Sequence, residues 1–416
     1  MSKEHKLKYL ACLAAGLFSF YNLFQLSLFN VISGHLLVAL RLTTTELGLF
    51  SGCFLLANAI GLVPIGLMLD RGLMRKVALF FLTLTACASF VIAISSSLLL
   101  SCLMRFFQGL ASAASLLICI RVVNSYFAKN TNLMLGALIA LALSGGIFGN
   151  FVFASVVHYI GWQSGLYIIS ILGLLLVTVI WLFLYENKDM AFFQNRCTPI
   201  SELKFLLQKK HTTIIGIYCG LMNLPVFILA TLWGNFYLSH RYPISAIEAA
   251  IASSLLFGGV MLGSLSWGYL ADKYLTQPAV MYLGCSLLFL LSLLFLIPNL
   301  SFLEIALIFF GFGFCSSSQN IVYAIINKNN PSTIRSTTNG IAMLISNGIG
   351  ALSQVLFGWL LYLKIPIGLL NVLPILLKQP FSIETIFFPF TFLACLILVF
   401  FLQPNSIRSQ LKPTLA

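Results

Sequence analysis

The chain has 416 residues, of which 60% are hydrophobic and 8% are charged, and its mean hydropathy is +1.02. A soluble domain carries about a quarter of its residues as charged side chains, so this composition excludes a soluble globular protein. The net charge of +13 would fit a nucleic-acid-binding protein, but the positions of the basic residues along the chain favour a different explanation.

Twelve apolar stretches of about twenty residues follow one another along the chain. A stretch of this length crosses a bilayer core, and lipid offers no hydrogen-bond partners, so each stretch must be a helix. We therefore predict an all-α membrane protein with twelve transmembrane helices in two pseudo-symmetric six-helix halves. The spans are expected at 9–31, 46–69, 77–95, 99–121, 133–157, 163–185, 212–237, 246–271, 278–297, 302–327, 337–360 and 383–402.

The basic residues divide unequally between the two sides of the membrane. With the N-terminus inside, the inner segments hold seventeen Lys and Arg, the outer loops hold four, and Arg105 and Arg121 lie within a span. Such a bias sets the orientation of a membrane protein. The charge thus indicates topology and no nucleic-acid partner, and we expect a multi-pass protein of the cell (inner) membrane with both termini cytoplasmic.

The longest polar interruption, 186–211, divides the chain. We expect an N-terminal half (1–185), a cytoplasmic linker (186–211) and a C-terminal half (212–416). An internal repeat supports this division, because Thr45–Arg71 aligns with Ile247–Lys273 at a shift of 202. The aligned pairs include Glu46 with Glu248, Gly61 with Gly263, Asp70 with Asp272 and, at the same shift, Gly109 with Gly311. Duplicated halves predict a solute site between them near the membrane midplane.

The strongest local motif is Gly66-Leu67-Met68-Leu69-Asp70-Arg71-Gly72-Leu73-Met74-Arg75-Lys76, between the second and third spans. It resembles the G-x-x-x-D-R-x-G-x-[RK]-[RK] loop of the major facilitator superfamily, although Leu73 stands where that family has its second glycine. A shorter repeat of this motif, GYLADK at Gly268–Lys273, lies between the eighth and ninth spans. The resemblance implies an inner gate in which Asp70 docks at the start of span eleven and Asp272 at the start of span five. The gate residues are Gly66, Asp70, Arg71, Arg75, Lys76, Gly268, Asp272 and Lys273; the alternative is that the basic residues only set topology.

Arg105-Phe106-Phe107-Gln108-Gly109 in the fourth span resembles the R-x-x-Q-G element of the same family, which is associated with coupling. A charge inside a span is costly unless it faces a polar cavity or a partner, although an arginine near a span end can extend to the interface instead. The resemblance places spans one, four, seven and ten around the central cavity. The predicted cavity residues are Tyr21, Asn22, Gln25, Arg105, Gln108, Asn223, Asn320 and Tyr323, whose alternative role is to join helices by hydrogen bonds.

No acidic residue lies deep in spans one, four or seven, so the coupling group is sought at span ends. Glu304 is the candidate for proton binding, because burial could make a carboxyl group there bind a proton. Glu46 and Glu248 are better explained as solvated carboxylates at headgroup level.

The chain carries no signature of an enzyme or a cofactor site. There is no Walker loop, no HExxH or GxSxG motif and no metal-ligand spacing of histidines, and the ten cysteines form no CxxC pair. We therefore expect no cofactor, no metal and no catalytic residues.

Together these features predict a monomeric secondary transporter that moves a small polar solute, such as an amino acid, peptide or similar metabolite, by alternating access. Proton-coupled uptake is the leading mechanism. The alternatives are a proton-driven exporter of a metabolite, siderophore or drug, and a transporter-like sensor, which the short loops disfavour.

Overall fold

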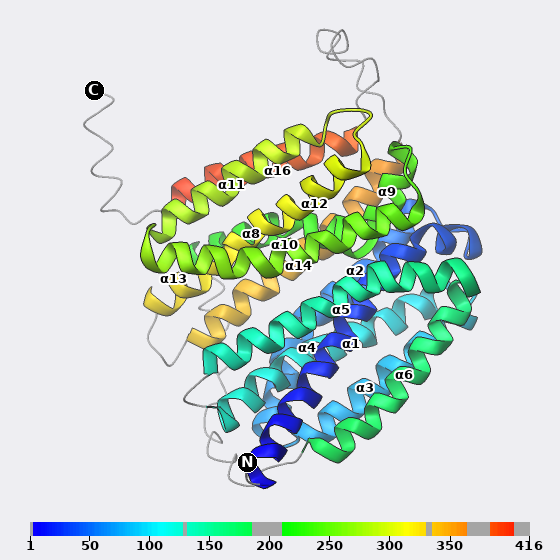
Figure 1. The fold of residues 1–416 in the computed structure, drawn as a ribbon, viewed down its shortest axis with the longest axis vertical. Coiled ribbons are helices and arrows are strands. Elements are labelled where there is room, and N and C mark those ends of the chain that lie inside the picture. Colours follow the sequence, from blue (N-terminus) through cyan, green and yellow to red (C-terminus); the bar gives the residue numbers. More distant parts are fainter. Residues whose placement is uncertain (1–2, 128–130, 185–209, 330–334, 364–382, 403–416) are drawn as a thin grey trace.

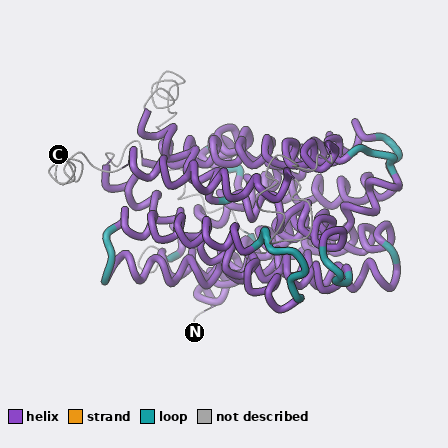
Figure 2. Tube along the Cα trace, turned by 90° about the horizontal axis from the view of Figure 1, so that it is seen from above, coloured by secondary structure: helices purple, strands orange, loops and turns teal. Residues whose placement is uncertain are grey.

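The computed structural model describes residues 3–127, 131–184, 210–329, 335–363 and 383–402. All regular structure within these ranges is helical (Figures 1 and 2). The helices of the first group are α1 (Lys3–Ala39), α2 (Thr44–Asp70), α3 (Met74–Ile94), α4 (Leu98–Tyr126), α5 (Thr131–Ile160) and α6 (Trp162–Phe183).

The second group begins after residues 185–209. Its helices are α8 (Lys210–Met222), η2 (Pro225–Trp233), α9 (Gly234–Arg241), α10 (Ala246–Lys273), α11 (Gln277–Leu294), α12 (Phe302–Ser316), η3 (Ser317–Asn320), α13 (Ile321–Asn329), α14 (Arg335–Leu363) and α16 (Ile383–Leu402). Every predicted span overlaps one of these helices or an interrupted set of them.

The described helices confirm an all-helical fold that crosses a membrane many times. Ten of them are long and apolar enough to span a bilayer, and α8 with η2 and α9 makes an eleventh if this bent pair is one span. In α16 the apolar stretch Ile386–Val399 is shorter than those of the ten.

Two spans of the second group are interrupted. The seventh predicted span bends by 44° at Pro225, and the turns that follow are π-helical as far as Trp233. The tenth contains a 3-10 turn, Ser317–Asn320, between α12 and α13. Proline removes a helix hydrogen bond, and π and 3-10 turns shift the partners of the backbone carbonyls, so both spans offer backbone groups that a straight α-helix would use internally.

The same helix pairs pack within each group. In the first group α1 packs on α5, α2 on α4 and α3 on α6; in the second, the corresponding pairs are α8 with α14, α10 with α12 and α11 with α16. The two groups lie one above the other in Figure 1 and meet through α2 with α14, α5 with α10, and α1 with η2 and α9.

The structure corrects one detail of the predicted repeat. A side chain at Gly109 of α4 would strike the carbonyl oxygen of Phe54, and one at Gly313 of α12 would strike that of Leu256. Phe54 and Leu256 are 202 residues apart, so Gly109 corresponds to Gly313 and the prediction of Gly311 was wrong. The helix caps agree, because Ser97 caps α4 and Ser301 caps α12, so the shift in this pair of helices is 204.

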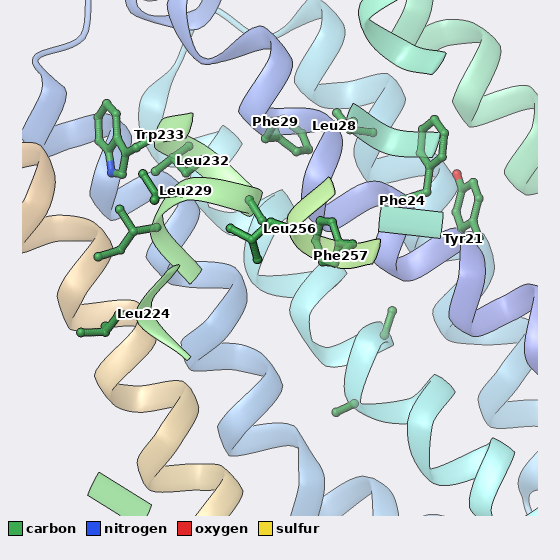
Figure 3. Packing of buried hydrophobic residues seen from close by; sticks show 14 of the residues in the cluster. Tyr21, Phe24, Leu28, Phe29, Leu224, Leu229, Leu232, Trp233, Leu256 and Phe257 are labelled. Carbon is green, nitrogen blue, oxygen red and sulfur yellow. The ribbon is translucent and has the colours of Figure 1, made fainter. Parts of the chain in front are cut away.

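The contact between the groups lies toward the predicted outer end, where α1 ends and α2 begins. Figure 3 shows side chains of α1 (Phe29), η2 (Leu229, Trp233) and α10 (Leu256, Phe257) at this junction. Gly48 and Gly52 of α2 bring that helix against the backbone of α14. This packing closes the predicted outer end of the junction.

Candidate functional site

Arg105 lies at the centre of a buried polar cluster that joins α1, α3 and α4. Its Nη1 donates to Gln108 Oε1 at 3.0 Å and to the carbonyl oxygen of Gln25 at 3.2 Å. Gln108 Nε2 and Gln25 Nε2 both donate to Ser89 Oγ, at 3.0 and 2.7 Å. We call Tyr21, Gln25, Ser89, Arg105 and Gln108 the Arg105 cluster. Arg105 and Gln108 are three positions apart on one helix, a spacing that places their side chains next to each other.

Aromatic rings surround the Arg105 guanidinium. Its carbon atom lies 4.2 Å from the ring centre of Phe29, 4.6 Å from that of Phe54 and 5.5 Å from that of Phe50. Rings at this distance attract a cation through their negative faces, and the attraction is stronger in a dry site. The prediction that Arg105 has a role inside the protein agrees with this geometry, because its side chain is fully buried and does not extend to the interface.

One edge of the guanidinium has no partner. Nε and Nη2 of Arg105 are buried and make no hydrogen bond with the residues that the structure describes. A buried donor without an acceptor is costly. These two N–H groups lie side by side in the planar guanidinium, in the arrangement that holds the two oxygens of a carboxylate.

Two amide oxygens of α1 also lack partners among the described residues. Asn22 Nδ2 donates to the carbonyl oxygen of Phe18 at 2.9 Å, and Gln25 Nε2 donates to Tyr21 Oη at 2.9 Å and to Ser89. These donors fix the amide orientations and leave Asn22 Oδ1 and Gln25 Oε1 buried without partners among the described residues. Tyr21 itself donates to the carbonyl oxygen of Ile169 at 3.0 Å, so its ring packs toward α6.

The predicted cavity residues of the second group lie on its two interrupted spans. Asn223 precedes the bend at Pro225 and is half-buried, as is Tyr323 in α13, whereas Asn320 is exposed and its Nδ2 donates to Ser264 Oγ at 3.0 Å. The described contacts do not bring these three residues to the Arg105 cluster, so their place around a common cavity stays a prediction.

Gln354 of α14 is a functional candidate that the sequence did not single out. It is fully buried, and its Nε2 donates to the carbonyl oxygen of Phe227 at 2.8 Å and to Thr231 Oγ1 at 2.9 Å. Its Oε1 has no partner among the described residues. A lone glutamine in an apolar helix carries no local signature, which is why it was missed.

The predicted gate residues lie at the opposite end of the molecule from the junction of the two groups. A Cβ atom at Gly66 or Gly268 would meet nothing within 4 Å, so neither glycine brings two helices together in this conformation. Arg71, Lys76, Asp272 and Lys273 are exposed, and Arg75 Nη2 donates to the carbonyl oxygen of Trp181 at 2.6 Å. The side chains of Asp70 and of the first three residues of α14 lie outside what the structure describes.

The turn between α2 and α3 accommodates the departure at Leu73. Gly72 has a φ of +80°, which glycine adopts without strain, while Leu73 has a φ of −90°. The residue that needs glycine in this turn is therefore Gly72, and leucine fits at position 73.

Glu304 has the same local role as two other glutamates. It accepts hydrogen bonds from the backbone N–H and the hydroxyl of Ser301, both at 2.7 Å, in a reciprocal cap at the start of α12. Glu46 forms such a cap with Thr43 on α2, and Glu248 with Ser245 on α10. Glu46 and Glu304 are exposed and Glu248 is half-buried, so local geometry does not mark Glu304 as a more buried carboxylate than the other two.

A second polar cluster, also missed from the sequence, joins the two helix groups. Asn30 Nδ2 of α1 donates to Asn150 Oδ1 of α5 at 2.8 Å and to Asn235 Oδ1 of α9 at 3.5 Å. The backbone N–H of Asn235 donates back to Asn30 Oδ1 at 3.1 Å, and Ser253 Oγ of α10 donates to Asn235 Oδ1 at 3.1 Å. We call Asn30, Asn150, Asn235 and Ser253 the outer amide cluster.

Within the described residues no group of three or more His, Cys, Asp or Glu side chains could hold a metal ion. Seven of the nine described cysteines are buried, Cys53 is half-buried and Cys87 is exposed. The site is therefore built from amides, hydroxyls and one guanidinium.

Comparison with protein families gives a match over most of the chain. The family described as "Major Facilitator Superfamily" matches residues 15–354. The "Probable galactarate/D-glucarate transporter GudP" of Bacillus subtilis (strain 168) is 26% identical over 367 residues, which cover 77% of this chain and 78% of that protein.

Solved structures of transporters share the fold. The crystal structure of the nucleoside transporter NupG superposes with a TM-score of 0.73 at 16% identity, covering 94% of this chain and 98% of that one. A bacterial homolog of the human lysosomal transporter Spinster, in an inward-facing and unoccupied conformation, gives a TM-score of 0.71 at 16% identity over 97% of this chain and 95% of that one.

Proposed function

The chain belongs to the major facilitator superfamily, and we propose that it takes up a small polar solute carrying one carboxylate, such as an amino acid or a similar metabolite, together with protons. The family assignment makes it a multi-pass membrane transporter of a small-molecule solute and not an enzyme. The solute class, the direction and the coupling ion are the proposal.

The unpartnered edge of Arg105 carries this proposal. A buried guanidinium with two adjacent free N–H groups is matched by the two oxygens of a carboxylate, and such a charge-assisted pair also supplies the counter-ion that the described surroundings of Arg105 lack. Arg105 is the only charged side chain that is fully buried among the described residues. One buried cation favours a solute with one carboxylate over a sugar diacid such as galactarate.

Two amide oxygens of α1, the helix whose Gln25 contacts Arg105, supply the second part of the argument. Asn22 Oδ1 and Gln25 Oε1 are acceptors without donors, and Gln25 also contacts Arg105 through its backbone. A solute that presents N–H or O–H donors next to its carboxylate, as an amino acid or a hydroxy acid does, satisfies both groups. Tyr21, Gln108, Asn223, Asn320 and Tyr323 complete the proposed solute site.

We further propose that the two helix groups, 1–185 and 212–416, rock about this site as a monomer. The excess of Lys and Arg at one end supports the orientation with cytoplasmic termini in the cell (inner) membrane, since Arg71, Lys76 and Lys273 lie at that end. The gate residues at the basic end, Gly66, Asp70, Arg75, Gly268 and Asp272, would come together when the predicted outer end opens. Glu304 remains the coupling candidate.

A proteoliposome experiment tests the solute class and the direction. Labelled zwitterionic amino acids, sugar monoacids, sugar diacids and nucleosides are offered with and without an inward proton gradient. We expect accumulation of a one-carboxylate solute, stimulated by the gradient and lost in Arg105→Gln. Gradient-driven loss of solute from preloaded vesicles would replace uptake by export, and accumulation of nucleosides or diacids alone would overturn the assigned solute class.

A further inference from the structure

The outer amide cluster connects the two helix groups more completely than any other described set of side chains. Asn30 and Asn150 belong to the first group, and Asn235 and Ser253 to the second. All four side chains are at least nine-tenths buried. Asn30 bonds to Asn150 within its own group and, through both ends of its amide, to Asn235 of the other group.

The seventh predicted span is shaped to receive this cluster. Asn150 Nδ2 donates to the carbonyl oxygen of Ala230 at 3.0 Å, within the π-helical turns. At Gly234, where these turns give way to α9, a Cβ atom would strike the Leu229 carbonyl oxygen and lie 2.7 Å from Ser253 Oγ. Only glycine leaves room here for Ser253 to reach Asn235.

The other described hydrogen bonds between the groups lie at the same end or near the membrane midplane. Thr44 Oγ1 donates to the Gly358 carbonyl oxygen at 2.6 Å, Ser254 Oγ to that of Ile147 at 3.2 Å, and Asn347 Nδ2 to Asn58 Oδ1 at 2.8 Å. Each of these pairs forms one bond between the groups, whereas Asn30 forms two with Asn235. Asn30 therefore forms more described hydrogen bonds between the groups than any of these three pairs.

We infer that Asn30 is a positioning residue for transport, which holds the predicted outer end closed through Asn150 and Asn235. This inference rests on the proposed rocking of the two groups. The chemistry suits a contact that must open in every cycle: water can replace neutral amide bonds when the end opens, so the net stability of each bond is small. A buried ion pair would require two charges to be resolvated and desolvated in each cycle.

Loss of the Asn30 amide shifts the balance between conformations. In Asn30→Ala, Asn235 loses its partner from the other group only in the closed state, because water replaces that partner when the end opens. The ratio of outward-open to inward-open protein is therefore expected to rise about tenfold, the factor that corresponds to losing one or two net hydrogen bonds.

Hydrogen–deuterium exchange of the protein in lipid nanodiscs tests whether Asn30→Ala opens the predicted outer end. The experiment uses no solute and no proton gradient, so its outcome does not depend on the proposed solute, direction or coupling. In Asn30→Ala we expect faster exchange toward the predicted outer ends of α1, α5 and α10, and slower exchange toward their opposite ends. Ser170→Ala is the matched control, because Ser170 is buried and donates to the Ala86 carbonyl oxygen within one group; it should show no such reciprocal change.

Faster exchange at both ends, or no change at either, would overturn the inference, because a contact that merely stabilises the fold has no reason to protect the opposite end when it is lost. If Asn30→Ala does not fold, Asn150→Ala provides the test with a shift in the same direction, since it removes the bond from Asn150 Nδ2 to the Ala230 carbonyl oxygen, which joins the two groups.

Discussion

The two helix groups use the same framework but fill it differently at one place. With the shift of 204 that the caps and glycines set between α4 and α12, Arg105 corresponds to Phe309 and Gln108 to Phe312. In the first group these positions hold a buried polar cluster. In the second, Phe309 and Phe312 pack on Phe295 with ring centres 5.8 and 5.7 Å apart.

This difference shows which parts of a duplicated fold must stay alike. The close approach of paired helices depends on glycine against backbone, and it is kept in both groups. The side chains beside that contact have diverged, one set toward a buried polar cluster and the other toward aromatic packing. Function in this chain is therefore expected to be asymmetric, with the charged chemistry of the solute site in the first group.

The strongest test of this asymmetry replaces Arg105 and, separately, the corresponding Phe309 by methionine. Arg105→Met should abolish uptake, by about 100-fold or more, while the protein still folds, because replacing a buried charge by an apolar side chain is often neutral for stability. Phe309→Met should retain uptake within about twofold and reduce stability by about 1 kcal/mol, as near-isosteric core changes do. Uptake and thermal unfolding of the two purified variants are measured side by side, and equal losses of uptake would contradict the asymmetry.

The shared framework is tested by adding one methyl group in each group. Gly109→Ala and Gly313→Ala place a Cβ atom on the carbonyl oxygen of Phe54 or Leu256, and backbone cannot move aside as a side chain can. Both variants should lose about 1 to 3 kcal/mol of stability, which is the usual range for overpacking. Gly348→Ala is the control, because its Cβ atom would meet nothing within 4 Å. If thermal unfolding shows a loss of stability in only one of Gly109→Ala and Gly313→Ala, the frameworks of the two groups differ.

The helical spans could be predicted from the sequence because lipid allows a long apolar stretch only one local structure. The pairing of Arg105 with Gln108 was also predictable, since it depends on helical spacing alone. The partners Ser89 and Phe29, by contrast, come from other helices, and their contacts depend on how α1, α3 and α4 are rotated. Asn30, Asn150 and Asn235 were missed for the same reason: three single asparagines on separate helices form a cluster only after the groups meet.

The predicted gate provides a smaller contrast between the groups. Asp70 belongs to the longer motif with Arg71 and Arg75, whereas Asp272 belongs to the shorter repeat of that motif, Gly268–Lys273. Asp70→Asn should lower uptake about tenfold while leaving solute binding measurable, because the gate contact and not the solute site is lost. Asp272→Asn should lower it less. Uptake in proteoliposomes and binding by isothermal titration separate the two effects, and a loss of binding in Asp70→Asn would count against the gate assignment.

The smallest effects are expected at the three capped glutamates, where the comparison runs across both groups. Glu46, Glu248 and Glu304 make the same reciprocal cap, so Glu→Gln at each removes the same carboxylate and weakens the helix start to the same small extent. Any effect on coupling must then come from what differs between them.

If Glu304 binds the coupling proton, Glu304→Gln abolishes the stimulation of uptake by a proton gradient while exchange of solute across the membrane without a gradient continues. Glu46→Gln and Glu248→Gln keep that stimulation and so serve as matched controls. Equal, small changes in all three variants would assign Glu304 a capping role alone and leave the proton site to a group inside the helix bundle.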